Sequence, residues 1–259
     1  MKILLTNDDG FYAPGISALH AELAKYADVL RVAPATEQSG VGHTITFLTP
    51  LLAHRAYQGD GQSDELLGWI VEGSPADCVK LGISELCDWR PDIVVSGING
   101  GLNAGINVLY SGTVAGAIEG AFFGITSVAV SLEFDDHANF GRAAELAWGV
   151  IQQVLQQKSA APQLYNINIP TVATRQPSQL RVVPMGTARY GEHYVKRSDP
   201  KGRDYYWATN DPPPEPSEQE TDLTALHAGH MTLTPLDYNM TKTGHLDAMR
   251  DWKFDSQGQ

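Results

Sequence analysis

Two adjacent aspartates stand where a short apolar run ends, close to the start of the chain. Residues 3–5 are Ile-Leu-Leu, and Asp8 and Asp9 follow after a Thr-Asn step and before Gly10. The apolar run suits a strand buried on both faces of a parallel sheet. Neighbouring carboxylates resist burial unless a positive charge lies beside them, and a divalent cation would supply it. The alternative is a solvated turn in which one aspartate caps a helix.

Two more loops carry oxygen donors where predicted strands end. A strand over residues 29–33 leads to Ser39, and a strand over residues 92–96 leads to a Gly-rich loop with Asn99. Loops at the carboxyl ends of neighbouring parallel strands share one edge of the sheet. Ser39 alone could be a turn residue, and Asn99 alone a left-handed residue of its loop. Together these loops offer four oxygen ligands for a hard cation, Mg²⁺ or Mn²⁺: Asp8, Asp9, Ser39 and Asn99.

A run of small residues leads into a predicted helix over residues 113–123. Ser111 is a natural N-cap, and the backbone N–H groups of Gly112 and Thr113 would point outward at the positive end of the helix dipole. Such a helix start can bind phosphate, although the spacing matches neither the Walker nor the dinucleotide motif. The alternative is a plain N-cap followed by glycines for close helix packing. Two residues on the same predicted edge complete the expected phosphate contacts: Asn7 and Gly40.

His43 follows the second loop and could donate a proton or a hydrogen bond to the substrate. A lone histidine is more often structural, so both interpretations stay open.

The amino-acid composition limits the kinds of ligand that this protein is expected to bind. The formal net charge is -12 and the sequence pI about 5.0, so no nucleic-acid polymer is expected as a ligand. The only cysteines, Cys78 and Cys87, lack metal-ligand spacing and are interpreted as reduced thiols. The N-terminus lacks the apolar core of a signal peptide, and no apolar stretch reaches transmembrane length. We therefore expect a cytoplasmic protein that does not bind membranes.

The order of predicted elements gives the fold class. Strand, loop and helix alternate through the first half, with a helix over residues 16–26 and a strand over residues 127–131, which implies parallel βαβ units. The predicted class is α/β, a Rossmann-like and mostly parallel sheet with flanking helices. Residues 1–184 would form the catalytic core. Residues 185–259, which include a Pro-rich run over residues 211–216, would form an extension that is not an independent domain.

Five motifs in this order resemble the SurE family of stationary-phase survival proteins, and they cover most of the chain. Residues 221–229 and 234–236 also resemble the family's C-terminal signature. The five motifs are as follows: Thr6-Asn-Asp-Asp-Gly10; Val32-Ala-Pro with Ser39-Gly40 and Gly42-His43; Gly73-Ser-Pro-Ala-Asp-Cys-Val-Lys80; Ser96-Gly-Ile-Asn-Gly-Gly-Leu-Asn103; and Ser111-Gly-Thr-Val-Ala-Gly-Ala-Ile-Glu119.

The resemblance implies a metal-dependent 5'-nucleotidase that hydrolyses nucleoside monophosphates, sometimes extending to 3'-nucleotides and short polyphosphate. It implies one divalent cation per subunit on Asp8, Asp9, Ser39 and Asn99, and a β-rich C-terminal extension that assembles a homodimer or homotetramer. The catalytic residues would be Asp8, Asp9 and Asn99, with either aspartate acting as base or nucleophile. Other functions stay open: a non-catalytic nucleotide sensor that uses the same edge, or an oligomeric scaffold.

Overall fold

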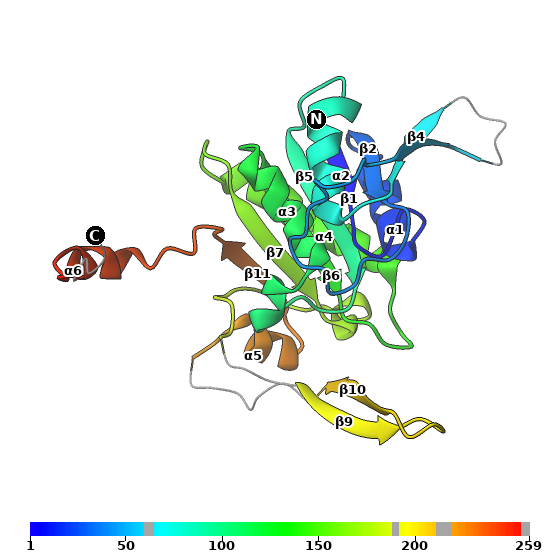
Figure 1. Cartoon of the computed structure of the whole chain (residues 1–259). Coiled ribbons are helices and arrows are strands. Elements are labelled where there is room, and N and C mark those ends of the chain that lie inside the picture. Colours follow the sequence, from blue (N-terminus) through cyan, green and yellow to red (C-terminus); the bar gives the residue numbers. More distant parts are fainter. Residues whose placement is uncertain (60–64, 188–191, 211–218, 255–259) are drawn as a thin grey trace.

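The computed structural model describes residues 1–59, 65–187, 192–210 and 219–254. A nine-stranded sheet forms its centre, in the order β3-β4-β2-β1-β5-β6-β7-β11-β8 (Figure 1). The strands of this sheet are β1 (Lys2–Thr6), β2 (Asp28–Pro34), β3 (Ala53–Tyr57), β4 (Leu66–Val71), β5 (Ile93–Gly100), β6 (Thr126–Leu132), β7 (Leu164–Ile169), β8 (Leu180–Val182) and β11 (Met231–Leu236).

The centre of the sheet is parallel. β4, β2, β1, β5, β6 and β7 pair in parallel, whereas β3 is antiparallel to β4, and β11 is antiparallel to β7. The predicted α/β class with a mostly parallel sheet is confirmed.

Helices cover both faces of the sheet, and the side chains of β1 alternate between them. Ile3 and Leu5 pack into the cluster that contains residues of α1 (Pro14–Leu23) and α4 (Phe140–Gln157). Leu4 packs on the other face, where the cluster contains residues of α2 (Pro75–Leu81). α3 (Gly112–Phe122) packs beside α2. Burial on both faces is the reason that β1 is a continuous apolar run.

Short helical segments complete the fold: η1 (Gly82–Leu86), η2 (Gly105–Leu109), η3 (Thr171–Thr174), α5 (Asp222–His227), η4 (Thr243–His245) and α6 (Leu246–Arg250).

Two segments in the last third of the chain lie away from the main sheet. β9 (Glu192–Ser198) and β10 (Asp204–Asn210) form a separate antiparallel hairpin, and α6 lies at the end of a tail that extends from the body (Figure 1). The Pro-rich run over residues 211–216 lies outside the described residues. Among the helices that the structure describes, none has the length and apolar character to cross a membrane.

Candidate active site

The loops that follow β1, β2 and β5 meet at one cleft of about 700 Å³, as the parallel arrangement predicts. The cleft brings together most of the residues expected from the sequence. Its described lining residues are Asp8, Asp9, Glu37, Ser39, Gly40, Asn99, Gly100, Leu102, Asn103, Asn107, Tyr110 and Ser111.

A sharp turn allows both aspartates to reach this cleft. β1 ends at Thr6, and Gly10 adopts a φ of 105°, so the chain leaves the extended conformation in which adjacent side chains point to opposite faces. Asn7 holds the turn from inside, because its buried side chain donates from Nδ2 to the carbonyl oxygen of Gly10 at 2.9 Å. Asn7 is therefore not among the residues that line the cleft.

Asp8 is the more enclosed of the two carboxylates, with 6% of its surface exposed. Burial raises the pKa of Asp8 from 3.8 to about 6, although the Thr113 hydroxyl opposes this shift by donating a hydrogen bond to Oδ1. The backbone N–H of Thr113 also lowers this pKa. Thr113, expected to bind phosphate, is thus engaged with Asp8.

Asp9 is half-buried and accepts a hydrogen bond at Oδ2 from the backbone N–H of Gly100 at 3.1 Å. Burial raises the pKa of Asp9, and the negative charge of Glu37 raises it further, whereas the Gly100 N–H lowers it. This hydrogen bond connects the loop after β1 to the end of β5.

Ser39 and Asn99 also line this cleft. The Ser39 hydroxyl donates to Oε1 of Glu37 at 2.5 Å. Asn99 donates from Nδ2 to the carbonyl oxygen of Gly101 at 2.6 Å, which leaves its amide oxygen as the atom suited to a cation.

The donor set fits a hard divalent cation. Three carboxylates line the cleft, and neither Lys nor Arg is among its described lining residues. No cationic side chain among these residues therefore offsets the cost of burying Asp8 and Asp9 together. Within the described residues no three His, Cys, Asp or Glu side chains form a metal-binding group, so a cation here would take two carboxylates, neutral oxygens and water.

The start of α3 lies directly against Asp8. Ser111 caps the helix by accepting the N–H of Val114 at 3.1 Å. A Cβ on Gly112 would lie 2.9 Å from Cβ of Asp8, so glycine is what allows the helix to come this close. The positive end of the α3 dipole thus faces the acidic cleft.

His43 lies in a different place from the one expected of a proton donor. Its Nε2 lies 2.8 Å from Oε2 of the buried Glu119, and its ring stacks on Phe122 with centroids 5.3 Å apart. His43 lines an adjacent, mainly apolar cavity of about 700 Å³, which shares Ser111 with the cleft. Its partner Glu119 is 76 residues away in sequence, so the sequence alone could not reveal the pair.

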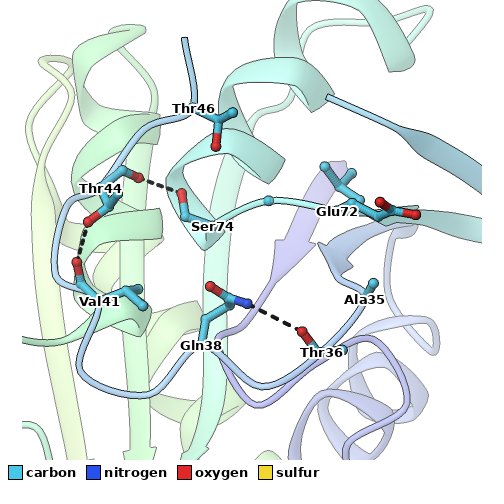
Figure 2. Close-up of a pocket in the computed structure, with 10 residues that line it drawn as sticks. Ala35, Thr36, Gln38, Val41, Thr44, Thr46, Glu72 and Ser74 are labelled. Carbon is cyan, nitrogen blue, oxygen red and sulfur yellow. Dashed lines mark hydrogen bonds between the residues drawn. The ribbon is translucent and has the colours of Figure 1, made fainter. Parts of the chain in front are cut away.

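The loop after β2 also lines a further cavity, of about 500 Å³ (Figure 2). Thr36 and Gln38 line this cavity, whereas Glu37 and Ser39 line the cleft. The loop that carries Ser39 thus lies between the cleft and this cavity.

Six lining residues were not predicted to act in the site: Glu37, Gly100, Leu102, Asn103, Asn107 and Tyr110. Glu37 could have been found as the remaining carboxylate of a loop already singled out.

These features define a class: an α/β protein with a mostly parallel sheet and an acidic, cation-suited cleft at the carboxyl ends of its central strands. A family model described as "Survival protein SurE" matches residues 3–192. The chain belongs to the SurE family.

Several relatives match nearly end to end. A protein of Rhodopirellula baltica called "5'-nucleotidase SurE" is 56% identical over 97% of this chain and 98% of its own length. One of the same name from Desulforudis audaxviator is 40% identical over 100% of both chains. The solved structure described as "Crystal Structure of Sure Protein from Aquifex aeolicus" superposes with a TM-score of 0.83 at 34% identity, over 96% of this chain and 98% of that one.

Proposed function

We propose that the protein is a metal-dependent phosphomonoesterase that hydrolyses nucleoside 5'-monophosphates to nucleoside and phosphate. The observation that carries the proposal is the convergence of Asp8 and Asp9 in a cleft without a cationic side chain among its described lining residues. The relatives named 5'-nucleotidase SurE support the activity. 3'-Monophosphates and short polyphosphate are proposed as further substrates.

The residues of the cleft would have separate roles in the reaction. A divalent cation held by Asp8, Asp9, Ser39 and Asn99 would act as a Lewis acid toward the phosphoryl group. The Gly112 N–H and the positive end of α3 would bind phosphoryl oxygens and stabilise the charge that develops on them.

The proton of the attacking water needs an acceptor, and we assign this role to Asp9. Asp9 is less buried than Asp8, whose carboxylate is held by Thr113. Water attacks phosphorus, the bond from phosphorus to the nucleoside oxygen breaks, and that oxygen takes up the proton that Asp9 accepted.

A screen of metals against substrates tests the function. The purified protein is stripped with a chelator, and phosphate release from AMP and other phosphomonoesters is measured with and without Mg²⁺ or Mn²⁺. We expect activity to disappear on stripping and to return with the cation. Calorimetric binding of AMP without phosphate release under any metal would instead indicate a nucleotide sensor.

Replacement of Asp9 gives the sharpest single-residue test. We expect Asp9→Asn to lower kcat for AMP by about 10³-fold or more, because the variant loses both a cation ligand and the proton acceptor. Circular dichroism and the melting temperature should remain close to wild type. Near wild-type turnover of AMP in metal-replete buffer would refute the assignment.

A further inference from the structure

One wall of the cleft is anchored from inside the molecule by Asp222, the first residue of α5. This residue is fully buried. Its Oδ2 accepts the backbone N–H of Gly105 at 2.8 Å, and its Oδ1 accepts the N–H of Gly186 at 2.8 Å. Oδ1 also accepts the N–H of Leu223 at 2.8 Å. A single carboxylate therefore joins the start of η2, the segment after β8 and the start of α5.

The chemistry of this anchor requires a carboxylate. Both oxygens accept N–H groups, and the donors come from separate segments. An asparagine would have to direct its NH₂ group at one of these donors and would lose that hydrogen bond. The segments are also tightly packed, since a Cβ on Gly105 would lie 2.9 Å from the Leu223 side chain.

A second anchor holds the same wall two residues earlier, at Asn103. Its backbone N–H donates to Oδ1 of Asn168 at 2.9 Å, and its carbonyl oxygen accepts from Nδ2 of Asn166 at 2.7 Å and of Asn168 at 3.0 Å. The Asn103 side chain donates to the Ser131 hydroxyl at 2.9 Å. All four residues are buried, so the network is well shielded from water.

The anchored wall differs chemically from the rest of the cleft. The loops after β1 and β2 supply carboxylates and a hydroxyl, whereas residues 102–110 supply uncharged side chains: Leu102, Asn103, Asn107 and Tyr110. The side chain of Tyr110 is 58% exposed. An uncharged surface that includes a leucine and a tyrosine, beside an acidic centre, suits a planar base attached to a phosphate.

We propose that Asp222 is a positioning residue of the cleft, which holds residues 102–110 as the wall that binds the base of the nucleotide. The inference rests on the proposed function, because it assumes a nucleotide substrate. It also assigns a role to the Thr221-Asp222 pair, which the sequence singles out and the reaction does not use.

The test compares AMP with ribose 5-phosphate, which lacks only the base. For full-length Asp222→Asn with saturating metal, we expect KM for AMP to rise about tenfold, while kcat for AMP stays within about twofold of wild type. KM for ribose 5-phosphate should also stay within about twofold, because this substrate has no base for the wall to bind. If ribose 5-phosphate is not turned over, its inhibition constant against AMP replaces KM.

Two outcomes would overturn the inference: an unchanged KM for AMP, or an equal loss of activity on both substrates, which marks a general structural effect. Failure of wild type to hydrolyse AMP would refute the proposed function instead, whatever the variant does.

Two more variants complete the experiment. Asp199→Asn is the matched control, because Asp199 also accepts backbone N–H groups, from Lys201 and Arg203 at 2.8 and 2.9 Å, but in the β9–β10 turn. We expect it to leave both KM values unchanged. If Asp222→Asn does not fold, Asn168→Leu loosens the other anchor and should raise KM for AMP alone; an unchanged ratio of the two KM values would contradict the proposal.

Discussion

Asp8 and Asp9 are neighbours in sequence but have different surroundings. Asp8 is enclosed and receives hydrogen bonds from Thr113, whereas Asp9 is more exposed and receives the Gly100 N–H. Burial is the main reason that the pKa of each is raised. A proton and a cation therefore compete for the same oxygens, and the outcome of this competition depends on pH.

The raised pKa of Asp8 predicts that removing its charge stabilises the metal-free protein, by an amount that depends on pH. Without metal, folding favours the protonated form, so the stability that Asp8 contributes is present below pH 3.8 and is lost as pH rises through about 6. The unfolding free energy of Asp8→Asn relative to metal-free wild type should therefore increase by about 2–3 kcal/mol as pH rises from 4 to 7. Denaturant unfolding at a series of pH values measures this difference.

Metal provides the control for that experiment. A cation that binds the folded wild type should raise its unfolding free energy at pH 7 and have a much smaller effect on Asp8→Asn. A wild type whose stability does not respond to Mg²⁺ or Mn²⁺ would contradict the cation site.

At the scale of elements, α3 connects the cleft to the core. Its N-terminus contacts Asp8, and its glycines let it lie close to the sheet. A Cβ on Gly120 would lie 2.5 Å from the Ser127 hydroxyl and 2.7 Å from Val94. Any displacement of α3 therefore changes the packing of the sheet as well as the position of Thr113.

We predict that Gly120→Ala destabilises the protein by about 1–3 kcal/mol through overpacking, although alanine is the better helix former. Gly149→Ala in α4 is the matched control, because the added Cβ would meet no described atom within 4 Å beyond its chain neighbours and the backbone of its own helix turn. It should be stabilising by about 0.5–1 kcal/mol. Chemical denaturation of both variants measures the two effects, and equal effects would show that packing at Gly120 is not limiting.

The elements that the sequence predicts well are those with simple apolar patterns. β1, β2, β5, β6 and α3 all lie where expected, within a few residues. β7 is not predicted, because Asn166 and Asn168 interrupt its apolar residues. These asparagines bind the backbone of Asn103, a partner more than 60 residues away. α4 is also missed, although its position explains why the face of β1 that carries Ile3 and Leu5 is buried.

The residues of the cleft also divide into those that local sequence patterns predict and those that only tertiary packing brings together. Asp8, Asp9, Ser39 and Asn99 could be placed together because the sequence puts each after a predicted strand of one parallel sheet. In the structure β5 continues to Gly100, so Asn99 lies in the last residues of that strand and not in the loop expected after residue 96. Contacts across the sheet, such as Thr113 with Asp8, depend on tertiary packing and have no local pattern in the sequence.

At the scale of the whole molecule, the β9–β10 hairpin exposes a row of aromatic side chains. Tyr205 and Trp207 lie two residues apart in β10 and therefore on the same face of the strand, and they are 41% and 63% exposed. The hairpin packs as a separate two-stranded sheet, and an isolated hairpin is marginally stable in water. We propose that it is an arm that assembles a homodimer or homotetramer.

Removal of these rings tests the arm. We expect Tyr205→Ser combined with Trp207→Ser to lower the molar mass measured by light scattering, because the contact between subunits loses its apolar anchors. Tyr26→Ser is a control on an exposed tyrosine outside the hairpin, three residues beyond the end of α1. An unchanged mass for the double variant would refute the role of the arm.

The place of β11 between β7 and β8 has a consequence for synthesis on the ribosome. β7 and β8 both pair with residues 231–236, which are translated after most of the chain. Until then β7 is an open sheet edge, able to pair with another nascent chain. A chain cut before residue 231 would expose this edge permanently, so such truncated products are expected to aggregate.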